Sequence, residues 1–137
     1  MSLLSIFFTA DEMTAVRIEL NHDLPQEDVA EMSAMEPLKL SMLWAIIDGK
    51  EWDVASIDEF TEVFAHDEEW LNIVPEDLVR KIASLDAARM WEASKAWAAT
   101  EEMQCSAEEA EDVIKMIAAV AQRAIDLKQS MYLYFCL

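Results

Sequence analysis

Glycine is almost absent from this chain of 137 residues, since Gly49 is the only one. Phosphate-binding and dinucleotide-binding loops need several glycines close together, because the backbone must approach the phosphates without side chains in between. One glycine cannot build such a loop. The chain also has no Gly-x-Ser-x-Gly segment, so the sequence lacks the common motifs of nucleotide-binding proteins and of serine hydrolases.

Cysteine and histidine are scarce as well, with two residues of each. Cys105 and Cys136 do not show the dense pairing of a secreted disulfide scaffold, so we expect free, buried thiols in a reducing cytoplasm. His22 and His66 stand outside any His-Glu-x-x-His segment, and Glu62 with His66 has no second pair of ligands nearby in the sequence. The sequence therefore predicts no metal site, no cofactor and no catalytic residue.

Basic side chains are few: ten lysines and arginines face 28 aspartates and glutamates, which gives a formal net charge of -18. Residues 18–38 and residues 51–79 contain acids but no lysine or arginine. Phosphate binding needs a basic surface, so this charge disfavours nucleic acid as a partner. It allows a basic protein partner, although acidity that serves only solubility is the alternative explanation.

Long apolar runs are missing too. Residues 1–8 are apolar, but they lack a basic start and lead directly into acids, which is unlike a signal peptide; no run approaches the length that spans a membrane. We therefore expect a cytoplasmic protein without a membrane partner. The length and the 54% of hydrophobic residues predict a single domain over residues 1–137 with a packed core.

The stretch from Ser106 to Leu137 is the one around which we expect the fold to be organised. Ser106 and Glu109 have the spacing of a capping box, which predicts a helix start. Apolar residues cover most of the helix over residues 113–125, so we expect it to have neighbours on most sides. Residues 131–137 are apolar throughout and rich in aromatics, which predicts a buried central strand.

The first part of the chain predicts a strand followed by two helices. Residues 3–8 form the strand, and Thr9 and Glu12 stand at capping-box spacing at the start of the first helix. A second helix begins near Pro25, whose missing amide suits the first turn. The apolar residues that we expect on the inner faces of these helices are Met13, Val16 and Leu20, and then Val29, Met32 and Met35.

The middle of the chain predicts three more helices. Residues 38–47 form an apolar helix, which Gly49 ends in the left-handed conformation. Ser56 and Glu59 repeat the capping-box spacing and predict a short helix over residues 57–65. A third helix opens at Pro75-Glu76-Asp77, where the acids suit the helix dipole.

An extended segment over residues 70–74 and a helix over residues 86–100, separated from its predecessor near Leu85, complete the expected elements. Tryptophans and methionines at helical spacing are expected in the core. The predicted fold is α+β and mostly helical: several helices packed on a small sheet that contains the first and last strands.

The order of these elements resembles the YfbM-like family of small bacterial proteins of unknown function. The resemblance rests on the opening strand, the segments LKLSMLWAIIDG (38–49) and VPEDLVRKIA (74–83), and the final helix with its apolar tail. The segment around Trp44 departs from the family in having no histidine. Small acidic bacterial proteins of this kind often act as immunity proteins, which are encoded beside a secreted toxin and block it in the cytoplasm; the resemblance implies this role here.

Two acidic stretches compete as a binding surface. The first combines carboxylates with aromatic side chains, which is the mixture that protein interfaces prefer. Its residues are Asp58, Glu59, Glu62, Phe64, His66, Asp67, Glu68, Glu69 and Trp70. The second, residues 101–112, places acids where a helix start favours them, so a structural reason already accounts for it. For both stretches, a merely solvated face is the alternative.

The function expected from the sequence is that of a non-enzymatic acidic binding protein. The leading hypothesis is an immunity or inhibitor protein whose first acidic stretch occupies the basic cleft of a bacterial toxin. The alternatives are a hydrolase that uses carboxylates and a divalent metal, and an accessory protein of a metabolic operon.

Overall fold

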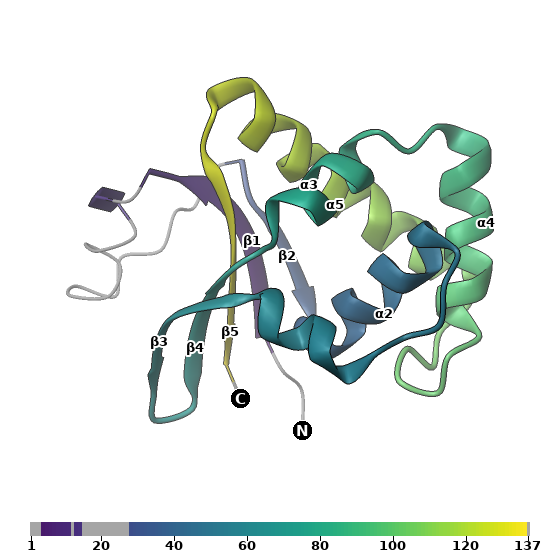
Figure 1. Cartoon of the computed structure of the whole chain (residues 1–137), viewed down its shortest axis with the longest axis horizontal. Coiled ribbons are helices and arrows are strands. Elements are labelled where there is room, and N and C mark those ends of the chain that lie inside the picture. Colours follow the sequence, from purple (N-terminus) through teal and green to yellow (C-terminus); the bar gives the residue numbers. More distant parts are fainter. Residues whose placement is uncertain (1–3, 12, 15–27, 137) are drawn as a thin grey trace.

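Five antiparallel strands form one sheet in the computed structural model, which describes residues 4–11, 13–14 and 28–136. The strand order is β2-β1-β5-β4-β3 (Figure 1). The strands are β1 (Leu4–Ala10), β2 (Ala30–Ser33), β3 (Thr61–His66), β4 (Glu69–Ile73) and β5 (Ser130–Cys136). The last strand is therefore the central one and pairs with β1 on one side and with β4 on the other, which confirms the prediction for residues 131–137.

Four α-helices and one short 3-10 helix accompany this sheet in the described residues. They are α2 (Pro37–Asp48), η1 (Val54–Glu59), α3 (Glu76–Ala83), α4 (Ala87–Ala98) and α5 (Ala107–Leu127). Helix α5 contacts α3, α4 and strand β1, and the helices form a layer along one side of the sheet (Figure 1). The predicted α+β class is confirmed. None of the helices in the described part of the chain is long and apolar enough to cross a membrane.

Strand β5 is apolar after Ser130 because both faces of its residues 131–134 are buried. Met131 and Leu133 belong to the large core between the sheet and the helices, together with Phe7 of β1. Tyr132 and Tyr134 belong to a second cluster on the opposite face, which also contains residues of β1, β3 and β4. Side chains alternate between the faces of a strand, so a strand buried on both sides needs apolar residues at every position.

Helix α5 begins as the sequence predicts. The Ser106 hydroxyl accepts the Glu109 amide at 3.1 Å and lies 3.2 Å from the Glu109 carboxylate, to which it donates. The expectation of neighbours on most sides is wrong, however, because Met116 and Ile125 are 39% and 40% exposed. The sheet, α3 and α4 bury one face of the helix and leave its outer face open.

The helix expected from Pro25 to Met35 is wrong over its second half, where residues 30–33 form strand β2 beside β1. Its supposed inner face is divided: Val29 packs on the second cluster, whereas Met32 and Met35 pack on the main core. Pairing with β1 satisfies the backbone of this segment, and that gain outweighs its weak helical pattern. Pro25 lies outside the described residues.

The capping residue expected at Thr9 is also wrong. Thr9 belongs to β1, and its hydroxyl donates to Gln129 Oε1 at 2.9 Å. Asp11 takes the capping role instead, because its carboxylate accepts the Thr14 amide at 2.7 Å. Met13 is 71% exposed. The other residues used in that prediction, Glu12, Val16 and Leu20, lie outside the described residues.

The helix expected over residues 57–65 is wrong as well. The chain forms η1 up to Glu59 and then enters β3. Asp53, not Ser56, caps η1, since its carboxylate accepts the Ala55 amide at 2.9 Å. Strands β3 and β4 are joined by a tight turn in which Asp67 adopts φ 53°, a left-handed conformation that aspartate tolerates better than most residues.

The remaining predicted elements are confirmed. Helix α2 ends at Gly49, which has φ 66° and donates its amide to Ile46. Strand β4 covers most of the extended segment expected over residues 70–74. Helix α3 follows Pro75, and the chain leaves the helical pattern between α3 and α4 near Leu85.

Candidate functional site

The acidic stretch singled out in the sequence forms η1 and the β3–β4 hairpin, at the edge of the sheet (Figure 1). The structure gives its nine residues three different environments. The exposed ones are Asp58, Glu59, Glu62, His66, Asp67 and Glu68, the half-buried ones are Glu69 and Trp70, and the buried one is Phe64. The hairpin therefore presents mostly carboxylates to the solvent.

The two aromatic anchors expected on this hairpin are engaged within the protein. Phe64 is only 4% exposed, and its ring stacks on that of His66 with 5.0 Å between the centroids. Trp70 stacks on Phe135 of β5 at 5.3 Å. Phe64 is part of the second cluster, so it is buried within the protein and is not an exposed anchor for a partner.

Glu69 differs from the other acids of the hairpin because it accepts a hydrogen bond from the Tyr134 hydroxyl. Burial, and then this hydrogen bond and the nearby Cys136, raise the pKa of Tyr134 well above its ordinary value of 10.0. Ionising Tyr134 would place a second negative charge beside Glu69 in a poorly solvated position. Glu69 therefore helps to attach β4 to β5.

The raised pKa of Tyr134 predicts a loss of stability at alkaline pH. An unfolded tyrosine ionises near pH 10 and the folded one does not, so the free energy of unfolding is unaffected below pH 10 and falls as the pH rises above it. Tyr134→Phe should cost about 1 kcal/mol at neutral pH through the lost hydrogen bond. The same substitution should flatten the alkaline decline, measured by urea unfolding at several pH values. An equal decline in the wild type and the variant would contradict this assignment.

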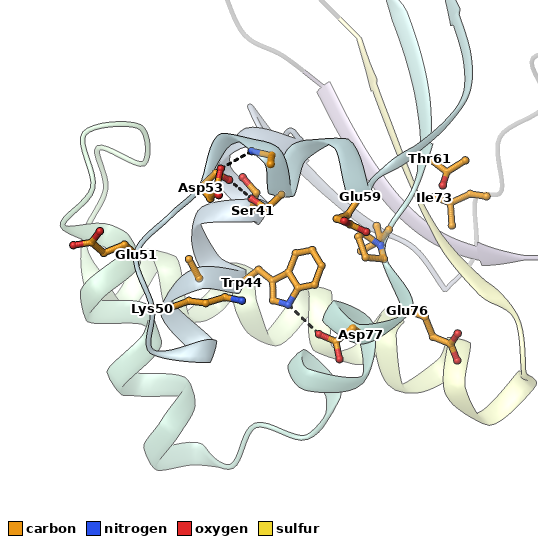
Figure 2. A pocket seen from close by; sticks show the side chains of 15 residues that line it. Ser41, Trp44, Lys50, Glu51, Asp53, Glu59, Thr61, Ile73, Glu76 and Asp77 are labelled. Carbon is orange, nitrogen blue, oxygen red and sulfur yellow. Dashed lines mark hydrogen bonds between the residues drawn. The ribbon is translucent and has the colours of Figure 1, made fainter.

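A groove of about 800 Å³ lies beside the hairpin, between α2, η1 and the start of α3 (Figure 2). Trp44 of α2 stands at its centre, half-buried, and the indole N–H donates to Asp77 Oδ2 at 3.2 Å. Thr61 and Ile73, the first residue of β3 and the last of β4, line the side nearest the sheet. Volumes between about 300 and 1,000 Å³ are usual for ligand sites.

Carboxylates dominate the lining of this groove. Five acids line it, and Lys50 is the one basic residue among the lining residues. The acids are Glu51, Asp53, Glu59, Glu76 and Asp77. The hydrogen bond from Lys81 is the main reason why the pKa of Asp77 lies below its usual value, and Lys81 Nζ is 2.8 Å from that carboxylate. Asp77 is therefore charged at neutral pH, and its Oδ2 atom accepts the hydrogen bond that orients the Trp44 indole.

Two exposed apolar residues, Trp52 and Val54, alternate in the sequence with residues that line the groove. Trp52 is 38% exposed and Val54 is 64% exposed. The Trp52 indole N–H donates to Ser41 Oγ at 2.8 Å, and Ser41 in turn donates to the Leu38 carbonyl at 2.7 Å. Trp52 is thus fixed in orientation while part of its ring remains in contact with solvent.

Sequence reasoning missed this groove because its walls come from three separate segments. Trp44 stands at helical spacing in an apolar helix, and such a residue is expected in the core. The one local signal is the segment Glu51-Trp-Asp-Val54, which places two large apolar residues among acids in a stretch without regular periodicity. Exposed aromatic residues next to charges are typical of binding surfaces.

The second acidic stretch has the structural explanation that the sequence indicates. Glu108 and Glu109 lie in the first turn of α5, and Glu111 forms an ion pair with Lys115 at 3.3 Å. Cys105 precedes this helix as a free thiol, and burial, followed by the charge of Glu109, raises its pKa. The thiol form of Cys105 therefore prevails at neutral pH, and a thiolate nucleophile is disfavoured there.

Metal-ligating side chains do not gather anywhere in residues 4–11, 13–14 and 28–136: no three of His, Cys, Asp and Glu are placed to hold an ion. Comparisons with protein-family models, with curated proteins and with solved structures found no match to this chain.

Proposed function

We propose that this chain is an acidic, non-enzymatic binding protein, which acts as a cytoplasmic immunity or inhibitor protein and neutralises a bacterial toxin by covering its basic cleft. The observation that supports this most is a set of five exposed carboxylates on η1 and the hairpin. They are Asp58, Glu59, Glu62, Asp67 and Glu68. None of the five has an ion-pair or hydrogen-bond partner within the described part of the chain.

Several acids on the helices do have such a partner. Helices α3, α4 and α5 place lysine or arginine three or four residues after an acid and form ion pairs along the helix. These pairs are Glu76–Arg80, Asp77–Lys81, Glu92–Lys95 and Glu111–Lys115. Residues 51–79 contain no cation of their own. Repulsion among the carboxylates of this segment opposes folding, and a basic partner would relieve it.

Such a surface favours rapid association with a basic cleft. Opposite charges steer the two proteins together before they touch, and the rate of association then falls as salt screens the charges. Tight residence needs buried contacts in addition, because exposed ion pairs add little affinity. The exposed Trp52 and Val54 beside the groove can supply those contacts, which Phe64 cannot.

The test is co-expression with the product of the neighbouring reading frame. We expect this protein to co-purify with an affinity-tagged copy of that product, to inhibit its toxic activity at an equal molar amount and to protect cells that express it. An unrelated basic protein of similar size is the control, and it should not be retained. A stable complex in which the partner keeps its full toxic activity would contradict the proposal. A metabolic enzyme as the neighbour, with no complex formed, would favour an accessory role instead.

A further inference from the structure

The ring of Trp44 occupies the centre of the groove. The indole N–H of Trp44 is already bound to Asp77, so the ring offers its face and not its polar edge. Figure 2 shows the ring face on at the centre of the groove, with Glu59 on one side and Asp77 on another. The face of an indole attracts cations, and carboxylates at its margin complete the recognition of a guanidinium group.

The charges inside the groove point to the same ligand. Glu59 has no partner in the described residues, and Asp77 keeps its carboxylate charged through Lys81. Figure 2 shows Glu51 and Glu76 directed away from the groove, and the Asp53 carboxylate accepts the Ala55 amide, which leaves Glu59 and Asp77 as the acids beside Trp44. One uncompensated carboxylate next to an aromatic face favours a cation over an anion or a neutral group.

Lys50 shows where such a cation would lie. Its side chain extends toward Trp44 in Figure 2, and the ammonium is only 3.6 Å from Asp48 in a loose ion pair. The Lys50 side chain is 71% exposed, so it can move aside. A strongly hydrated ammonium is a poor substitute for guanidinium, which is weakly hydrated, planar and able to stack on an aromatic ring.

We propose that this groove receives an arginine side chain of the basic partner, which stacks on Trp44 and pairs with Glu59, while the residues next to that arginine contact Trp52 and Val54. This inference rests on the proposed function, since it identifies the feature of a basic protein that the acidic surface would recognise. It relocates the centre of the interface from the hairpin to the groove.

The probe is a short peptide, acetyl-Gly-Arg-Gly-amide, titrated at low salt into the whole protein labelled with ¹⁵N. The signal to follow is the indole N–H of Trp44, assigned with Trp44→Phe. We expect the arginine peptide to shift this signal in a saturable way, the lysine analogue to bind more weakly and the glutamate analogue to leave it unchanged. Binding of the glutamate analogue, or equal binding of all three peptides, would overturn the inference.

Three variants test whether the peptide binds in the groove. Glu59→Gln should weaken binding about five-fold, as expected when a partly exposed ion pair is lost. Glu101→Gln is the matched control, an exposed acid that lies outside the groove, η1 and the hairpin, and it should bind like the wild type. Lys50→Ala should bind more tightly, since it removes the competing cation. Equal effects of the two glutamine variants, or weaker binding by Lys50→Ala, would contradict an arginine site here.

The inference and the proposed function fail in different ways. If the peptide leaves Trp44 unaffected while the neighbouring gene product still forms its inhibited complex, the arginine site is wrong and the function stands. If the peptide binds as expected and the neighbouring product is neither bound nor inhibited, the groove recognises arginine in some other protein and the immunity role is wrong.

Discussion

A chain that lacks residues 131–137 should not fold. Strand β5 is the central strand, and the sheet without it separates into a β2–β1 pair and a β4–β3 hairpin. Four nearly inaccessible side chains disappear with it: Met131, Tyr132, Leu133 and Tyr134. Each contributes about 1.5 to 3 kcal/mol by burial, so the loss of roughly 6 to 12 kcal/mol is comparable to the whole stability of a typical domain of about 5 to 15 kcal/mol.

Circular dichroism and a thermal melt measure this result directly. The truncated chain should lack a cooperative transition, and it should aggregate because the edges of β1 and β4 are uncovered. Leu133→Ala is the milder version and should cost about 2 to 5 kcal/mol, because Leu133 is 0% exposed. Leu127→Ala is its matched control: Leu127 is 46% exposed, and the change should cost less than about 1 kcal/mol. A soluble truncated chain with an unchanged melt would contradict the role of β5.

The terminal strands could be predicted from the sequence because a strand that is buried on both faces needs apolar residues at consecutive positions. Residues 131–136 are apolar at consecutive positions, and only a strand covered on both sides needs that pattern at such a short length. Helix α5 was predictable for a local reason too, since Ser106 and Glu109 lie within one turn and form their hydrogen bond without help from the rest of the fold.

The segment between Ser56 and Ala65 could not be predicted in this way. Phe60 and Phe64 are four residues apart, which fits one face of a helix as well as it fits a bulged strand. What decides between them is pairing with β4, where a register shift between Glu62 and Phe64 lets the strand bury Phe64. That pairing depends on residues 69–73 and on β5 beyond them, and no local pattern reports it.

The negative charge of the candidate site could be predicted from the sequence, but the exposure of its aromatic residues could not. Acids in a stretch without cations remain exposed in almost any fold, so the solvent exposure of Asp58, Glu62 and Glu68 follows from composition. The burial of Phe64 and the partial exposure of Trp44 depend on which segments meet. The groove joins α2, η1 and α3, and contacts between distant segments are what a single sequence reveals least.

Reversing three charges of the acidic surface should slow association with the proposed basic partner by about ten-fold or more, because electrostatic steering accounts for ten-fold to thousand-fold in association rates. The variant carries Lys at Asp58, Glu62 and Glu68, which are all exposed. Asp67 is left unchanged because its left-handed turn conformation, with φ 53°, suits aspartate better than lysine. A thermal melt of the variant should match the wild type, so that the rate reports binding and not folding.

A second variant with the same net charge separates local from global electrostatics. It carries Lys at Glu101, Asp112 and Asp126, which are exposed residues outside η1 and the hairpin. Both variants have six positive charges more than the wild type, since each reversal adds two. Only the first should lose most of its association rate if the partner approaches the proposed surface.

The central claim is that a basic partner binds this acidic surface. The most direct measurement is the association rate constant of the proposed partner with the wild type and both variants at increasing salt. The wild type and the Glu101/Asp112/Asp126 variant should associate fast at low salt and slow steeply as salt rises. The Asp58/Glu62/Glu68 variant should be slow throughout, with little dependence on salt. Three identical salt profiles would contradict the claim and would leave η1 and the hairpin as a solvated face.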